Sequence, residues 1–255
     1  MSPDIIGIAI AALLGSMLGS FLNVLILRLP VDESVVFPGS HCPRCQAAIA
    51  WYDNVPILSW VVLGGKCRHC RESISVQYPI IELITALLWA AAAWHYGLNL
   101  TGLAAAVFGT LLLGIAVTDA RHYLIPDEYT LGGLVLGLLL SYRGGWEGVL
   151  QAVIGAAVGF VLLYGVAVAG SKMFGKEAMG GGDIKMMAMV GAFVGWRGVL
   201  LTIFGGSLLG TLVFVPLSLK QKRLVPFGIF LAAAAGLTFV FGEQIVAWYM
   251  GWVLG

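Results

Sequence analysis

The amino-acid sequence predicts an all-α polytopic membrane protein, with about eight transmembrane helices and one zinc-ribbon-like loop on the cytoplasmic side. Of its 255 residues, 60% are hydrophobic and 11% are charged, whereas an ordinary soluble domain has roughly 25% charged residues. Apolar runs of about 20 residues, the length that spans a bilayer, alternate with short polar breaks. All four cysteines fall in the one long polar segment.

The expected helices follow the apolar runs. The first run, residues 5–27, lacks a basic leading region and a small-residue cleavage site, so we expect a retained span and not a signal peptide. Two later runs are short, and we expect protein neighbours or local thinning of the bilayer to accommodate them. The predicted helices cover residues 5–27, 79–97, 100–118, 128–142, 147–170, 184–196, 198–219 and 226–253.

The basic residues orient these helices. If the N-terminus lies outside and successive spans alternate in direction, 12 of the 14 Lys and Arg residues fall on one side of the membrane and 2 on the other. The positive-inside rule makes the richer side cytoplasmic. The net charge of +1, without a basic stripe, predicts a lipid-embedded protein with no nucleic-acid partner. The twelve residues lie in the breaks 28–78, 119–127, 171–185 and 220–225.

Three parts follow from this pattern: a first transmembrane span at 1–28, a cytoplasmic loop at 29–78, and a multi-span membrane domain at 79–255. The loop contains the pairs Cys42-Pro-Arg-Cys45 and Cys67-Arg-His-Cys70. Two such pairs hold Zn²⁺ tetrahedrally, with four thiolates at about 2.3 Å.

Two disulfides or four free thiols are the alternatives to a metal site. Lasting disulfides are rare in the reducing cytoplasm, and free thiols would leave the regular spacing unexplained. A Cys₄ site has no open coordination position, so we expect the zinc to fold the loop and to take no part in catalysis.

Ionisable side chains in a spanning helix are costly and are therefore functional candidates. Asp119 ends the third predicted helix, and Asp183 follows Gly180, Gly181 and Gly182 at the start of the sixth. Two neighbouring carboxylates can share one proton. The ionised member then activates water, and the protonated member polarises a peptide carbonyl. The glycines leave room for an extended peptide; the alternative is a plain turn with Asp183 as a helix N-cap.

Together these motifs resemble the bifunctional type IV prepilin peptidases, also called leader peptidase/N-methyltransferases, over nearly the whole chain. The run ending at Asp183 resembles the G-x-G-D signature of intramembrane aspartyl proteases, which pair that aspartate with one placed like Asp119. The other motifs that carry the resemblance are Gly19-Ser20-Phe21-Leu22-Asn23-Val24, Arg28-Leu29-Pro30, both cysteine pairs, Asn54-Val55-Pro56 with Ser59-Trp60, Tyr78-Pro79 with Glu82-Leu83, and the segment from Asp119 to Asp127.

The resemblance implies a multi-pass enzyme of the bacterial inner membrane whose active site faces the cytoplasm. Members of this family cut the short basic leader from type IV prepilins or pseudopilins, typically after a Gly. They then methylate the new N-terminal residue, usually Phe, with S-adenosylmethionine. The mature subunits build type IV pili or the pseudopili of type II secretion, and which of these the chain serves stays open.

Methyl transfer requires a neutral amine aligned with the sulfonium. Glu82, beside the loop, is a candidate for substrate binding or for the base, and a pairing or capping role is equally open; Asp53 and Asp127 are weaker candidates. No glycine-rich nucleotide fingerprint is visible, so methylation rests on the resemblance. It is favoured because peptidase-only relatives lack the cysteine loop. The segment Val225-Pro226-Phe227-Gly228 also resembles a family motif, although Pro is ordinary in a first helical turn.

Three alternatives remain. One is a peptidase without methyl transfer. Another is a proton-coupled transporter in which Asp119 and Asp183 relay protons, although such proteins often show repeated halves and polar groups at the midplane. The third is a noncatalytic scaffold whose zinc loop docks a partner.

Overall fold

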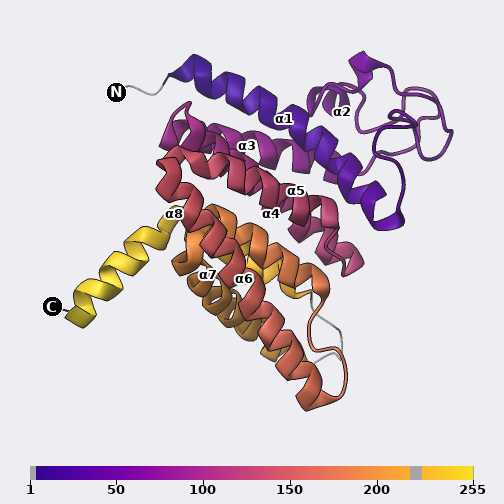
Figure 1. Cartoon of the computed structure of the whole chain (residues 1–255). Helices are drawn as coiled ribbons and strands as arrows, with labels where there is room; N and C mark the ends of the chain where they lie inside the picture. Colours follow the sequence, from indigo (N-terminus) through magenta and orange to yellow (C-terminus); the bar gives the residue numbers. More distant parts are fainter. Residues whose placement is uncertain (1–3, 219–225, 255) are drawn as a thin grey trace. The chain divides into compact units, whose positions relative to one another are not determined.

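The computed structural model describes residues 4–218 and 226–254, and this part of the chain is helical with irregular connections and no extended strand (Figure 1). The chain divides into two compact units, Met1–Thr110 and Leu111–Gly255. The predicted break at 220–225 and the last residue of the predicted helix 198–219 lie outside the described residues.

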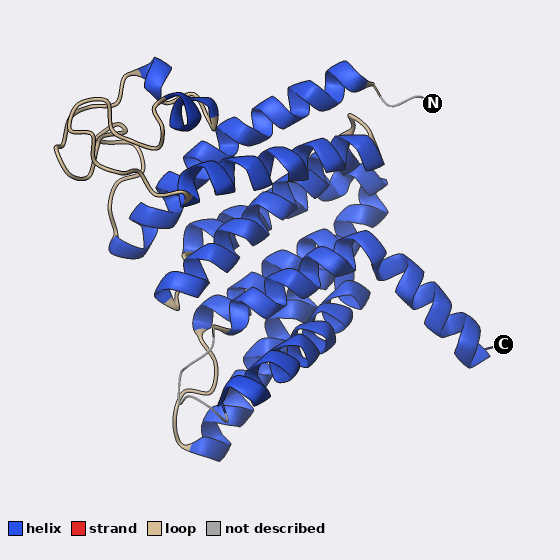
Figure 2. Ribbon diagram, turned by 180° about the vertical axis from the view of Figure 1, so that it is seen from behind, coloured by secondary structure: helices blue, strands red, loops and turns tan. Residues whose placement is uncertain are grey.

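The first unit contains two long helices, α1 (Ile5–Arg28) and α3 (Gln77–Tyr96), which lie side by side (Figures 1 and 2). Their backbones approach at two glycines of α1. A Cβ atom on Gly15 would lie 2.7 Å from the carbonyl oxygen of Thr85, and one on Gly19 would lie 2.8 Å from Cα of Glu82. Small residues permit such close approach between helices in lipid.

The loop between α1 and α3 contains only short helical turns. These are η1 (Leu29–Val31), η2 (Trp51–Asp53) and α2 (Leu58–Val62). The loop lies at the end of α1 where its chain leaves the helix (Figure 2). It matches the predicted polar segment 29–78 except that α3 begins two residues earlier than the predicted helix.

Helix α4 (Leu100–His122) crosses from the first unit to the second. In the second unit, α7 is the central helix, and Met186, Met187 and Val190 on it are fully buried. Glycines of its neighbours allow this burial, because a Cβ on Gly137 would lie 2.9 Å from the Phe193 ring. The elements are α5 (Asp127–Leu140), η3 (Ser141–Gly144), α6 (Gly145–Phe174), α7 (Gly181–Ser218) and α8 (Phe227–Leu254).

Six stretches of the described residues are long and apolar enough to cross a membrane, whereas the sequence predicts about eight helices that do so. The predicted helices 128–142 and 147–170 fall in one apolar stretch, Asp127–Phe174, in which η3 joins α5 to α6. The predicted helices 184–196 and 198–219 fall in α7, where Gly195 has non-helical angles of φ 67° and ψ 177°. A 14-residue helix such as α5 is about 21 Å long, so it would cross about 30 Å of hydrocarbon only with protein neighbours or local thinning of the bilayer.

Candidate aspartate site and cysteine cluster

Asp119 lies in the last turn of α4, and its side chain is 5% exposed. The backbone N–H groups of Gly228 and Ile229, in the first turn of α8, face its carboxyl group. The N-terminus of a helix attracts negative charge. A Cβ atom on Gly228 would lie 2.7 Å from Asp119 Oδ2, so only glycine leaves space for the carboxyl there.

Asp183 lies in the first turn of α7, which begins at Gly181. It is therefore inside the helix and is not the N-cap that the alternative reading assigned to it. The charges of Asp119 and Asp183 act on each other, so α4 and α7 bring the two predicted aspartates together.

Ile125 fills the space beside this pair. A Cβ on Gly182 would lie 2.9 Å from Ile125 Cβ, and one on Gly228 would lie 2.9 Å from Ile125 Cδ1. Gly181 has open space instead, and a Cβ on Gly180 would meet only Asp183 Oδ2 at 3.5 Å. The glycine run thus packs tightly at Gly182 and leaves an open approach at Gly181.

Two carboxyl oxygens of the pair are available for a ligand. Asp119 Oδ2 and Asp183 Oδ1 are buried, and neither has a hydrogen-bond partner among the described residues. A buried polar atom without a partner costs about 1–3 kcal/mol. A water molecule or a peptide group held between the two aspartates would remove this cost.

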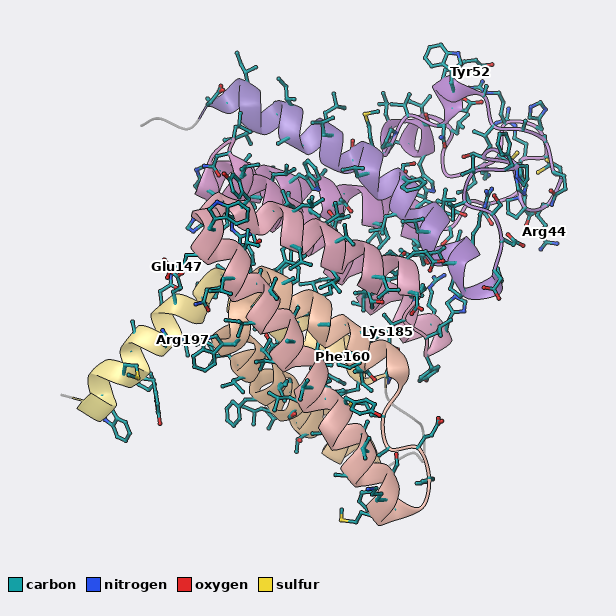
Figure 3. All side chains as sticks on the ribbon, viewed as in Figure 1. Arg44, Tyr52, Glu147, Phe160, Lys185 and Arg197 are labelled. Carbon is teal, nitrogen blue, oxygen red and sulfur yellow. The ribbon has the colours of Figure 1, made fainter. Side chains whose placement is uncertain are left out.

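An ion pair links the starts of α5 and α7 next to the aspartates. Lys185 Nζ lies 2.7 Å from both carboxyl oxygens of Asp127, and Lys185 is labelled in Figure 3. The side chains are 39% and 52% exposed, so the pair contributes little stability. Two further ionisable residues of the helices, His122 in α4 and Glu243 in α8, are exposed.

The four cysteines form a cluster in the loop of the first unit. Their Sγ atoms all lie within 4.8 Å of one another, and Cys42 Sγ lies 3.8 Å from Cys70 Sγ. A zinc tetrahedron with bonds of about 2.3 Å has S···S edges of about 3.8 Å, so the donor set fits Zn²⁺. Backbone N–H groups of Cys45 and Arg44 lower the pKa of the Cys42 thiol to about 6, which favours the thiolate that binds metal.

The two halves of the cluster have the same local fold at a sequence offset of 25 residues. Cys42 N donates to Ala47 O at 3.0 Å, and Cys67 N donates to Glu72 O at 2.9 Å. Gln46 and Arg71, at equivalent positions, both have positive φ angles. The bridges His41↔Ala48 and Lys66↔Ser73 also correspond. Each half is thus a turn that directs two thiols to the same point.

An ion pair connects the second half of the cluster to η2. Arg68 Nε and Nη2 donate to Asp53 Oδ2 and Oδ1 at 2.7 and 2.5 Å, and this hydrogen bonding holds the pKa of the Asp53 carboxyl below its usual value. The Arg68 guanidinium also lies 5.7 Å from the centre of the Tyr52 ring. Asp53 therefore has a structural partner in the loop.

Glu82 connects the loop to the helix pair. Its side chain is 6% exposed, and its Oε2 accepts a hydrogen bond from Ile57 N at 2.6 Å. Ile57 precedes α2 and has φ 62°, a strained conformation for a β-branched residue. The sequence left open whether Glu82 takes part in methyl transfer or caps a polar group. In the structure, Glu82 caps the backbone N–H group of Ile57.

The sequence did not predict that Gly228 and Ile125 are part of the aspartate site. The available signal for Gly228 was the Pro226-Phe227-Gly228 motif, which is also ordinary at a helix start. Only the approach of α8 to the end of α4 gives that glycine a role beside Asp119.

Comparison with known proteins identifies the family. Residues 13–96 match the bacterial peptidase A24 N-terminal domain, and residues 106–215 match the type IV leader peptidase family. A prepilin leader peptidase/N-methyltransferase of Aeromonas salmonicida is 36% identical over 267 residues, covering 93% of this chain and 92% of its own. The chain belongs to the type IV leader peptidase family.

Other members of the leader peptidase family carry the same name. The protein from Pseudomonas aeruginosa is 36% identical over 93% of this chain and 91% of its own length. The protein from Myxococcus xanthus is 40% identical over 84% of this chain, which spans 64% of that relative. No solved structure matches the chain. Both aspartates lie in the segment that matches the leader peptidase family, and the cysteines and Glu82 lie in the segment that matches the N-terminal domain.

Proposed function

We propose that this chain removes the leader peptide of type IV prepilins or pseudopilins with Asp119 and Asp183, and then methylates the new N-terminal residue with S-adenosylmethionine. One observation carries the proposal. Asp119, which is buried, lies near Asp183, which is half-buried, at the end of α4 and the start of α7, in a chain whose relatives are named prepilin leader peptidase/N-methyltransferase.

The cleavage step uses both carboxyl groups. The ionised aspartate takes a proton from a water molecule while the oxygen of that water attacks the scissile carbonyl carbon. The protonated aspartate donates a hydrogen bond to the carbonyl oxygen. When the C–N bond breaks, the leaving nitrogen takes a proton from the pair. The glycine run supports this role, because Gly181 leaves open space beside Asp183.

The membrane arrangement that we propose has about eight crossing helices, with the loop and both aspartates on the cytoplasmic side of the bacterial inner membrane. Figure 3 shows Lys185 at one end of the second unit and Glu147 and Arg197 at the other. The positive-inside rule assigns the first end to the cytoplasm. Gly195 and η3 divide the two long stretches at the opposite end, which supports a hairpin at each point.

The Cys₄ loop, within residues 29–78, would hold Zn²⁺ through Cys42, Cys45, Cys67 and Cys70, and the peptidase would occupy 79–255. The metal would supply a cross-link between the two halves of the loop and no open coordination position. The 3.8 Å separation of Cys42 Sγ and Cys70 Sγ supports this assignment.

Methyl transfer would occur in the first unit, where the loop meets α1 and α3. Asn23 Oδ1 and Gln77 Nε2, an acceptor and a donor, are buried there without a partner among the described residues. Asn23 Nδ2 already donates to Tyr78 O at 3.1 Å, which fixes the side chain. These groups suit a polar ligand such as S-adenosylmethionine, which supplies an electrophilic methyl group. Glu82 would hold the loop in place beside them.

The test separates the two activities. Purified protein is incubated with a prepilin and S-adenosylmethionine, and mass spectrometry reports the cleaved chain and the methyl adduct separately. We expect wild type to cleave and methylate, and Asp119→Asn and Asp183→Asn to lose cleavage. If either correctly folded variant cuts at the wild-type rate, the aspartate mechanism is wrong. Cleavage by wild type without methylation would leave a peptidase alone.

A further inference from the structure

One face of the short helix α2 is apolar and exposed. Leu58, Val61 and Val62 are exposed, whereas Ser59 on the other side is buried. Residues at positions i, i+3 and i+4 lie on the same face of a helix, so the three apolar side chains form one patch. Removal of apolar surface from water is favourable, and the patch therefore favours an apolar partner.

The position of α2 along α1 indicates what that partner is. Ile57, which precedes α2, donates its N–H to Glu82 Oε2 at 2.6 Å. Glu82 lies opposite Gly19 of α1, because a Cβ on Gly19 would lie 2.8 Å from Glu82 Cα. Gly19 precedes Arg28, the last residue of α1, by nine residues, which is about 13.5 Å along the helix. Figure 1 accordingly shows α2 beside α1 and not beyond its end.

This level of α1 and α3 faces hydrocarbon and not water. Both helices are long and apolar enough to cross a membrane. Helix α1 has 24 residues and is about 36 Å long, so a hydrocarbon layer of about 30 Å centred on it reaches within about 3 Å of Arg28. Residues 24–27, just before Arg28, are all apolar. Phe21 of α1 and Leu83 of α3, close to Gly19 and Glu82 in sequence, are exposed as lipid-facing side chains are.

The backbone next to α2 has the internal hydrogen bonds that a segment in lipid requires. Polar backbone groups at membrane depth need partners within the protein. Glu82 accepts from Ile57 N, and Ser59 Oγ accepts from Val55 N at 3.1 Å. The Ser59 hydroxyl also donates to Tyr52 O at 3.0 Å. Two buried side chains, Glu82 and Ser59, thus satisfy polar groups of the segment on the side opposite the apolar patch.

The residues that flank α2 suit the boundary between lipid and water. Trp51 and Tyr52 before the helix and Lys66 after it are exposed. Trp and Tyr rings gather where a bilayer meets water, and basic side chains are attracted to anionic headgroups. This combination beside an apolar face favours a lipid partner.

We propose that residues 55–63 re-enter the bilayer from the loop, with Leu58, Val61 and Val62 against lipid acyl chains. The segment anchors the cysteine-containing loop to the membrane, and Glu82 holds it at its depth. All of these residues lie in the first unit, so the inference does not depend on the proposed cleavage and methylation.

The experiment measures the depth of position 62 by fluorescence quenching. A fluorescent amino acid replaces Val62 in the full-length chain, which is placed in nanodiscs of phosphatidylethanolamine and phosphatidylglycerol. Bromine atoms on the acyl chains quench a probe in lipid, and iodide quenches a probe in water. The probe at position 62 should be quenched by brominated chains about as strongly as one at Leu83, and only weakly by iodide. A probe at Leu58 should behave in the same way, and it replaces the first if that variant does not fold.

Val36 is the matched control. It is 65% exposed, close to the 71% of Val62, and it lies in the same loop. Arg28 Nη1 donates to Ser34 O at 2.9 Å, which keeps the segment around Val36 at the end of α1. A probe at Val36 should be quenched several-fold more by iodide than one at position 62, and several-fold less by brominated chains.

Three results would overturn the inference. Equal iodide quenching at positions 62 and 36 would place α2 in water. Quenching at position 62 by neither agent would show that protein covers the patch. Iodide quenching at position 62 that an added prepilin relieves would assign the patch to the substrate.

Discussion

At the residue scale, the aspartate pair shows how far sequence reasoning extends. Asp119 and Asp183 are recognisable because charged residues at the ends of apolar helices are rare. Their surroundings are not recognisable, because Gly228 and Ile125 have no unusual chemistry and reach the site only through tertiary packing. Sequence therefore predicts the reacting groups, and the structure supplies the residues that position them.

Gly228→Ala should impair cleavage without unfolding the protein. The new Cβ would lie 2.7 Å from Asp119 Oδ2 and would displace the carboxyl, and a misplacement near 1 Å can cost about 100-fold in rate. We expect kcat for leader cleavage to fall about 10- to 100-fold. Gly251→Ala, on the same helix but with open space around it, should cleave at the wild-type rate. Equal rates for both variants would show that Gly228 does not shape the site.

Glu82 variants should distinguish a positioning residue from a base. The Gln side chain keeps an oxygen that can accept the Ile57 hydrogen bond, whereas Ala keeps none. If Glu82 positions the loop, Glu82→Gln retains much of the methylation rate and Glu82→Ala loses it about tenfold or more, since a hydrogen bond to a charged group is worth about 1.5–3 kcal/mol. Cleavage should change little in either variant. Complete loss of methylation in Glu82→Gln with normal zinc content would identify Glu82 as the base.

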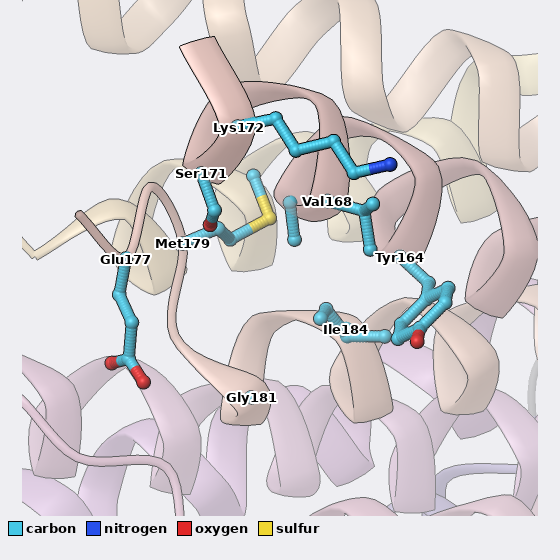
Figure 4. Close-up of a pocket in the computed structure, with 9 residues that line it drawn as sticks. Tyr164, Val168, Ser171, Lys172, Glu177, Met179, Gly181 and Ile184 are labelled. Atoms are coloured by element: carbon cyan, nitrogen blue, oxygen red, sulfur yellow. The ribbon is translucent and has the colours of Figure 1, made fainter. Parts of the chain in front are cut away.

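At the element scale, the positions of the helices are predictable and their ends are less so. The predicted helix at 100–118 ends where the apolar run ends, but α4 continues to His122, so Asp119 is held on a helix. Likewise α6 continues to Phe174 and not to 170, and this added turn carries Ser171 (Figure 4), whose Oγ accepts a hydrogen bond from Ala178 N in the connection to α7. Hydropathy marks where lipid contact ends, whereas a helix continues until its hydrogen-bond ladder stops.

Loss of the two buried cysteines should remove the metal. In Cys42→Ser/Cys67→Ser, two of four thiolates are absent, and structural zinc sites of this kind contribute about 10–16 kcal/mol. We expect atomic absorption to find about one zinc per wild-type chain and almost none in the variant. Methylation should be lost while cleavage persists, because the aspartates lie in the other unit.

His69→Ala is the control for that experiment, since His69 lies between the cysteines in sequence and is not part of the thiol cluster. It should keep its zinc. A double-cysteine variant that retains the metal would show that the cluster is not the zinc site.

At the scale of the whole molecule, the sequence correctly predicts an all-helical membrane protein with a cysteine-containing loop. The number of crossings is harder to predict, because a kink and a hairpin both interrupt hydropathy in the same way. Gly195 and η3 lie in long apolar stretches, and periodicity alone does not tell whether the chain turns back there. Charge provides the independent signal, through Arg143 and Arg197 near these points.

Reporter insertions should decide the crossing number. We expect a reporter after Gly175, in the connection between α6 and α7, to be cytoplasmic, and one after Gly144 to be on the other side of the membrane, because basic residues gather near the first position. A reporter in the loop at Gly39, where a side chain would meet open space, serves as the cytoplasmic reference. If the Gly144 and Gly175 reporters lie on the same side of the membrane, the number of crossing helices is smaller than eight.

The contact between α6 and α7 has a mechanical consequence. Added Cβ atoms on Gly155 and Gly191 would collide with the backbone of the opposite helix, and close-packed surfaces of this kind transmit strain without yielding. The two helices therefore act as a stiff frame, and α7 holds Asp183 in its first turn at one end of that frame. Binding at a stiff site loses little entropy through ordering of the protein. The position of Asp183 relative to α6 should then change little when the temperature rises.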